Sequence, residues 1–92
     1  MDKAKLKRWS TIFRALANPN RLKIIKILSS GESLPVSSIA RDIKISLKST
    51  SKHWIMLKNL DILDAVGKQG RVFYSLNADV PADLRKTLAL FL

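Results

Sequence analysis

The pattern of apolar positions along the chain first predicts an amphipathic helix over residues 3–17. Its large apolar side chains recur at helical spacing: Leu6, Trp9, Ile12, Phe13 and Leu16. A second helix is expected to follow, because Asn18 suits an N-cap and Pro19 suits the first helical position, where no N–H is needed. We expect the Ser-Ser-Gly of residues 29–31 to end this second helix.

Two helices joined by a tight connection are expected next. Residues 36–43 have apolar positions on one side and predict a short third helix. Beyond Lys44 and Ile45, Ser46 is expected to cap a fourth helix that runs to about Leu60. The apolar stripe of this fourth helix consists of Thr50, Trp54 and Leu57.

The apolar period then changes from helical to alternating, so residues 63–76 predict a β-hairpin. Gly67 and Gly70 bracket its basic tip, as expected of a tight turn. The strand residues expected on one face are Val72, Tyr74 and Leu76.

A last helix is expected over residues 82–92, with Asp79 or a neighbour as its cap and Pro81 at its start. It is too short to be stable alone and must pack, most simply against the helix of residues 3–17. The large apolar residues of the two helices predict a dimer surface made of Leu6, Trp9, Phe13, Leu84, Leu88 and Phe91. The alternative is that these residues only complete the core of one chain.

Three short helices followed by a basic hairpin predict a winged helix-turn-helix, a mostly α fold with a small β-hairpin. Ninety-two residues are enough for one such domain, which we expect to span residues 1–92. Residues 36–60 are expected to form the helix-turn-helix, with the recognition helix at its end, and residues 62–76 to form the wing.

The charge of the chain then narrows the class of partner. The chain has 17 Lys and Arg against 7 Asp and Glu, a formal net charge of +10. Such an excess points to a polyanion as the partner, with nucleic acid ahead of an anionic membrane or an acidic protein, while solubility is the alternative explanation.

The absence of cysteine excludes disulfides, thiolate metal sites and cysteine nucleophiles. The sequence contains no apolar run of membrane-spanning or signal-peptide length, so we expect a cytoplasmic protein.

An α-helix with an apolar back and a basic front suits the major groove of double-stranded DNA. The candidate contacts on the fourth helix are Ser46, Lys48, Ser49, Ser51, Lys52 and His53. At the hairpin tip, Lys68, Gln69 and Arg71 are expected to reach a phosphate or the minor groove. Arg21 is a further candidate for a phosphate contact, with a structural cap or ion pair as its alternative role.

His53 also suggests catalysis or metal binding, but the chain lacks the partners for either. A metal site needs three or four ligands, and no other histidine and no cysteine occurs. Ser49 lies one turn before His53, yet the sequence has no oxyanion-hole signature or nucleophile elbow. We therefore expect neither an enzyme nor a metal site or cofactor, and His53 to pack at the helix flank or donate to a phosphate.

Three stretches carry a family pattern: "ALANPNRLKIIKILSSGESLPVSSIA", "ISLKSTSKHWIMLKNLDIL" and "GKQGRVFYSLN". With these motifs, nearly the whole chain resembles the arsenic-repressor (ArsR/SmtB) family of winged-helix repressors. The resemblance implies a homodimer whose first and last helices form the interface. It also implies repression that an inducer, often a metal ion, relieves.

The chain departs from that family where its metals bind. The founding arsenic sensors have a Cys-Val-Cys where this chain has Pro35, Val36 and Ser37, and the last helix here has Asp83 but no histidine. Lys44 and Asp61 stand where glycine is usual. If either residue adopts positive φ, the strain costs about 1 kcal/mol, and Asp tolerates it better than Lys.

The expected function is therefore a homodimeric DNA-binding regulator, a repressor without the usual metal-sensing sites, acting on an imperfect palindrome. Two alternatives stay open. The high charge also suits a nucleoid-type protein that binds DNA with low specificity. A winged helix can instead use its hairpin or basic face to bind an acidic protein.

Overall fold

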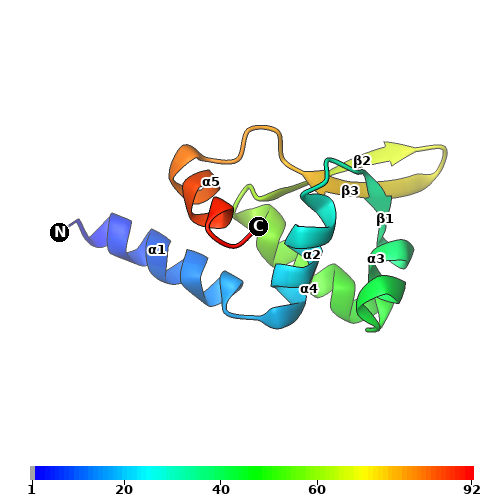
Figure 1. Cartoon of the computed structure of the whole chain (residues 1–92), viewed down its shortest axis with the longest axis horizontal. Coiled ribbons are helices and arrows are strands. Elements are labelled where there is room, and N and C mark those ends of the chain that lie inside the picture. The colour runs from blue at the N-terminus through cyan, green and yellow to red at the C-terminus, as the bar shows by residue number, and fades with distance from the viewer. Residues whose placement is uncertain (1) are drawn as a thin grey trace.

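Five α-helices and three β-strands form the fold in the computed structural model, which describes residues 2–92. They are α1 (Lys3–Leu16), α2 (Pro19–Leu28), β1 (Leu34–Pro35), α3 (Val36–Ile43), α4 (Leu47–Asn59), β2 (Leu63–Lys68), β3 (Arg71–Leu76) and α5 (Ala82–Ala89). The N-terminal part of α1 and the β2–β3 hairpin project from opposite ends of a molecule that measures 46 × 24 × 22 Å (Figure 1). The expected mostly helical fold with a small hairpin is confirmed. Met1, which the expected domain included, lies outside the described residues.

Two of the expected helix caps are present. The Asn18 side chain accepts hydrogen bonds from the N–H groups of Asn20 at 2.9 Å and Arg21 at 3.2 Å. The Ser46 hydroxyl accepts one from the N–H of Ser49 at 3.0 Å. Each bond satisfies a backbone donor that the first turn of a helix leaves unpaired, and it sets where the helix begins.

The start and end of α5 correct our expectation. Its N-cap position is Pro81, whose side chain cannot accept a hydrogen bond. Asp79 lies three residues before the first helical residue, too early to cap it, and its N–H donates to Asn77 Oδ1 at 2.9 Å. The helix also ends at Ala89 rather than continuing to residue 92.

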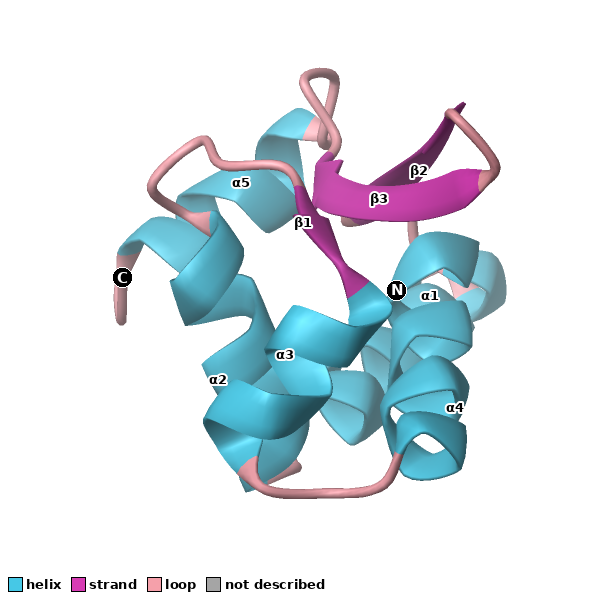
Figure 2. Ribbon diagram, turned by 90° about the vertical axis from the view of Figure 1, so that its right-hand side faces the viewer, coloured by secondary structure: helices cyan, strands magenta, loops and turns pink. Residues whose placement is uncertain are grey.

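The sheet contains the expected hairpin and one strand that the sequence pattern did not predict. Lys68 pairs with Arg71, so the turn is Gln69-Gly70, with φ of 52° and 76°. Positive φ at both central residues is the geometry of a type I′ turn, and glycine lacks the Cβ that resists it. The additional strand, β1, pairs with β3 and makes the strand order β1-β3-β2 (Figure 2). Two residues, one of them proline, are too short to show an alternating pattern.

One core joins all five helices to the base of the hairpin. Its fully buried members are Ile12, Ile24, Ile25, Leu28, Ile39, Leu57, Ile62, Leu63 and Leu84. Leu84 and Leu88 of α5 are therefore buried within their own chain, which corrects their expected place on a dimer surface. Other members of that expected surface are open to solvent, namely Leu6 (52% exposed), Phe13 (58%) and Phe91 (38%).

Both positions where glycine was missing adopt the left-handed conformation. Lys44 has φ 61° and Asp61 has φ 59°. Behind Asp61, the N–H of Ile62 donates to the Leu57 carbonyl at 3.1 Å and the N–H of Asp61 to the Lys58 carbonyl at 2.9 Å. These two bonds form a Schellman motif that ends α4 and turns the chain into β2.

Lys44 is therefore a site where glycine should stabilise the protein. We expect Lys44→Gly to raise the free energy of unfolding by up to about 1 kcal/mol, since relief of the left-handed strain outweighs the added freedom of the unfolded chain. Lys44→Ala keeps the Cβ and should bring no such gain. Urea unfolding of both variants measures the difference, and a less stable glycine variant would contradict the strain.

Candidate nucleic-acid interface

The buried side of α4 determines which of its residues face solvent. Thr50 and Leu57 are fully buried, and the Trp54 ring stacks on Tyr74 of β3 with centroids 4.5 Å apart and planes 12° apart. The indole N–H of Trp54 has no hydrogen-bond partner in the described part of the chain, and the ring is held by this stack and by the Lys58 ammonium, whose Nζ lies 6.0 Å from a ring centroid. With this side held, Lys48 and Lys52 lie exposed on the opposite side.

The N-terminus of α4 is open to an anion. Ser46 and Ser49 are exposed, and their hydroxyl oxygens are 3.0 Å apart. The first turn contains no acidic residue, so the positive end of the helix is not neutralised by its own side chains. Ser51 is half-buried beside Tyr74. Burial raises the pKa of the Tyr74 phenol, and a hydrogen bond with Ser51 offsets part of the rise.

The wing carries the second group of expected contacts. Lys68, Gln69 and Arg71 are exposed at the tip, where β2 and β3 extend past the helices (Figure 1). The Arg71 guanidinium lies 5.5 Å from the ring centroid of Phe73, within the range of a cation–π contact. The expected contacts are therefore exposed at two places, the front of α4 and the hairpin tip.

Of the two alternatives for Arg21, the structure shows the structural one. Its Nε donates to the Ala15 carbonyl and its Nη2 to the Arg14 carbonyl at 3.2 Å, at the C-terminus of α1. Its Nη1 lies 3.2 Å from both Nδ1 of His53 and Sδ of Met56 on α4. Arg21, on α2, thus ties α1 to α4.

The contact with Arg21 determines the protonation state and tautomer of the His53 ring. A guanidinium can only donate, so Nδ1 of His53 must accept, which requires a neutral ring that carries its proton on Nε2. Partial burial lowers the pKa of His53, and the Arg21 charge lowers it further. The Ser49–His53 pair that suggested a nucleophile is not formed, because Nδ1 faces Arg21 and the Ser49 hydroxyl contacts Ser46. His53 therefore packs at the helix flank, with its Nε2–H left to donate.

Three exposed apolar residues on α4 were missing from the expected site. Leu47 is 55% exposed, Ile55 is 50% exposed and Met56 is 38% exposed. The sequence held a signal for Ile55, since it lies seven residues after Lys48 and three after Lys52 and so shares their side of the helix.

Neither a metal cluster nor a membrane span is formed by the described residues. Across residues 2–92, no three His, Asp or Glu side chains gather where they could hold a metal ion. In the same range, no helix has the length and apolar character needed to cross a bilayer.

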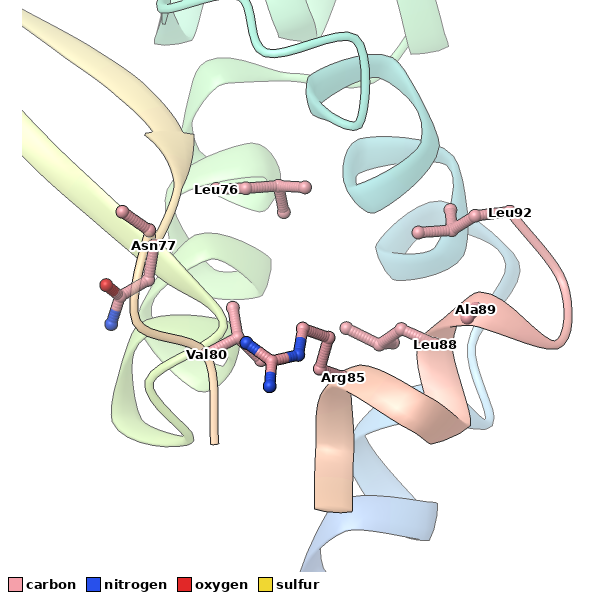
Figure 3. Close-up of a pocket in the computed structure, with 8 residues that line it drawn as sticks. Leu76, Asn77, Val80, Arg85, Leu88, Ala89 and Leu92 are labelled. Atoms are coloured by element: carbon pink, nitrogen blue, oxygen red, sulfur yellow. The ribbon is translucent and has the colours of Figure 1, made fainter. Parts of the chain in front are cut away.

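A cavity of about 410 Å³ opens between the end of β3 and α5 (Figure 3). Leu76, Val80, Leu88 and Leu92 make it mainly apolar, and Asn77 and Arg85 supply polar groups at its edge. The Asn77 side chain already bonds the Asp61 carbonyl at 3.2 Å and the Asp79 N–H at 2.9 Å. None of the residues that line this cavity belongs to α4.

Comparison with known proteins identifies the family. The model for bacterial regulatory proteins of the arsR family matches residues 18–65, more than half of the chain. The chain belongs to the arsR family. The matched segment runs from the Asn18 cap through α4 into the first strand of the wing, so it contains the whole helix-turn-helix of this ArsR-family protein.

Individual relatives agree with this assignment. The transcriptional repressor SdpR of Bacillus subtilis (strain 168) is 32% identical over 80% of this chain and 81% of SdpR. The cadmium resistance transcriptional regulatory protein CadC of Listeria innocua is 36% identical over 78% of this chain, which spans only 64% of CadC. A homodimeric winged helix-turn-helix DNA-binding domain from Mycobacterium bovis, a possible ArsR-family regulator, superposes with a TM-score of 0.79 at 26% identity. That match covers 95% of this chain and 77% of the other.

The Arg21 junction should be sensitive to the shape of the side chain as well as its charge. We expect Arg21→Lys to lower the free energy of unfolding by about 1.5–3 kcal/mol, because one ammonium cannot replace the forked donors that reach two carbonyls and α4. The matched control is Arg14→Lys, which alters an exposed side chain and should stay within about 0.5 kcal/mol of wild type. Urea unfolding compares the two variants. An Arg21→Lys variant as stable as Arg14→Lys would contradict the stabilising role of the Arg21 contacts.

Proposed function

We propose that this ArsR-family chain is a homodimeric, sequence-specific DNA-binding transcriptional repressor. The observation that carries the proposal is the exposed side of α4. Lys48 and Lys52 lie there, opposite the buried Thr50 and Leu57, and the first turn of the helix contains no acidic residue. A helix of this kind fits the major groove, where base edges present a readable pattern of donors and acceptors. In this pose Ser46 and Ser49 lie at the end that approaches a phosphate.

The wing supports the same pose. Lys68, Gln69 and Arg71 are exposed at the hairpin tip, which supports a contact with the backbone or minor groove beside the site. The relatives support a repressor, since SdpR is named a transcriptional repressor and the Mycobacterium bovis neighbour a homodimeric DNA-binding domain.

The dimer surface that we propose centres on α1. Leu6 and Phe13 are more than half exposed on it, and the Trp9 ring lies 5.5 Å from the ring of Phe13. Arg8 of α1 donates to Asp83 of α5 at 3.0 Å, which ties the outer part of α1 to the last helix. Phe91, just past α5, adds exposed apolar surface. Two-fold pairing through this surface presents two α4 helices to half-sites about one helical turn apart, in an imperfect palindrome.

We further propose that this repressor does not use the family's metal positions. At the third helix, Pro35, Val36 and Ser37 offer no thiolate. On α5, Asp83 is engaged by Arg8, whose hydrogen bond lowers the pKa of the carboxyl group. A metal panel should therefore leave DNA binding unchanged.

A second candidate function is a nucleoid-type protein with little sequence preference, which the net charge of +10 favours. Selection of bound duplexes from random DNA separates the two. A repressor enriches a defined sequence, whereas a nucleoid-type protein binds the selected and the random duplexes about equally.

Lysines on α4 should contribute measurably to DNA binding. We expect Lys48→Ala and Lys52→Ala each to weaken DNA binding. Each lost phosphate contact should also reduce the slope of the logarithm of the binding constant against the logarithm of the salt concentration by about 1. Arg71→Ala should weaken binding with less change in sequence preference. Lys86→Ala on α5 is the matched control and should have little effect. Fluorescence anisotropy at several salt concentrations gives both readouts, and unchanged affinity in all three variants refutes the groove assignment.

The α1 surface should control the oligomeric state. Phe13→Glu places a charge in the proposed apolar interface and should shift the protein toward monomer by at least tenfold in dissociation constant. Val66→Glu changes a similarly exposed apolar residue on the wing and should leave the dimer intact. Sedimentation equilibrium measures the dimer dissociation constant of both variants. If Phe13→Glu dimerises as tightly as wild type, the interface does not include Phe13.

A further inference from the structure

The exposed surface of α4 carries two large aliphatic side chains besides its cations: Ile55 on the side of Lys48 and Lys52, and Leu47 at the flank of the helix N-terminus. Leu47 is the first residue of the helix, beside the Ser46 cap, and Ile55 follows Lys48 by two turns. About half of each side chain is exposed, and the core is closed beneath them by Thr50 and Leu57. Single exposed aliphatic residues are common on protein surfaces. Here Leu47 and Ile55 both occur on the short helix that carries the proposed DNA contacts, whereas Met56, 38% exposed on the same helix, has its Sδ 3.2 Å from Arg21 Nη1.

An aliphatic side chain in the major groove has few favourable partners. It has no donor or acceptor, so a base nitrogen or oxygen or a phosphate placed against it loses water without gaining a hydrogen bond. The exception is the 5-methyl group of thymine, which is apolar and points into the major groove. The mixed face of α4 therefore suits DNA that presents methyl groups as well as phosphates.

We propose that Leu47 and Ile55 read thymine methyl groups in the DNA site. The proposal rests on the function proposed above and names the base that this helix selects. The two residues are eight positions apart, roughly 12 Å along the helix axis. With α4 lying along the groove, this span corresponds to thymines about three or four base pairs apart. Lys48 and Lys52, between them, contact phosphates or guanine.

The test removes the methyl groups from the DNA. A duplex selected by the wild-type protein from random DNA is synthesised again with deoxyuridine at each thymidine position. Deoxyuridine keeps every hydrogen-bonding group and lacks only the methyl. Wild-type binding should weaken by about fourfold for each methyl that is contacted, the value of burying one carbon group. Anisotropy titrations at fixed salt measure this uracil penalty.

Protein variants then assign the methyl contacts. Leu47→Ala and Ile55→Ala should bind the thymine duplex more weakly and show a smaller uracil penalty than wild type. Lys48→Ala is the matched control, because it should lose affinity on both duplexes and keep the full penalty. Deoxyuridine also changes duplex flexibility, but that change affects all four proteins equally and cancels in the comparison. Thermal unfolding confirms that each variant is folded.

The outcomes separate this inference from the function on which it rests. If an enriched sequence binds equally with uracil, or if both alanine variants keep the wild-type penalty, methyl reading is refuted and the repressor stands. If selection enriches no sequence, the sequence-specific function fails, and the reading of thymine fails with it.

Discussion

The stack of Trp54 on Tyr74 is the contact on which the arrangement of the proposed DNA-binding surface depends. It joins α4 to the central strand of the sheet with ring centroids 4.5 Å apart, and Leu57 is fully buried on the same helix. Because β3 is also half of the hairpin, this contact joins the helix to the wing, in addition to the Schellman motif that leads from α4 into β2. The lysines of α4 face outward because the opposite side of the helix, with Thr50, Trp54 and Leu57, packs inward.

Arg21 makes the second connection to the same helix. It satisfies two carbonyls at the end of α1 and contacts His53 and Met56 of α4. These backbone acceptors would otherwise lack partners where α1 ends against α2. A basic residue that the charge pattern associated with DNA thus connects α1, α2 and α4, and partial burial together with its charge lowers the pKa of His53.

Local signals in the sequence predicted most of the fold, and non-local contacts account for what it missed. Asn18 and Ser46 were recognisable as caps, because a cap needs only its own next three residues. The partners of Arg21 lie up to 35 positions away, and no spacing rule points to them. Leu84 suited a core and an interface equally, because the apolar stripe of a helix is the same whether its own chain or a second chain buries it. The exposed lysines of α4 were predictable from its apolar stripe of Thr50, Trp54 and Leu57, but the strand on which that stripe packs was not.

The junction at Arg21 also has a bearing on how such proteins diverge. In the dimer proposed through α1, the angle between the two copies of α4 depends on the interface and on the corner in each chain where α1 ends and Asn18 begins α2. Adding or removing one residue in α1 rotates the dimer face by about 100° relative to that corner. In that dimer the length of α1 would be tied to the spacing of the DNA half-sites, and insertions in α1 should be far less tolerated than insertions in the loop between α2 and β1.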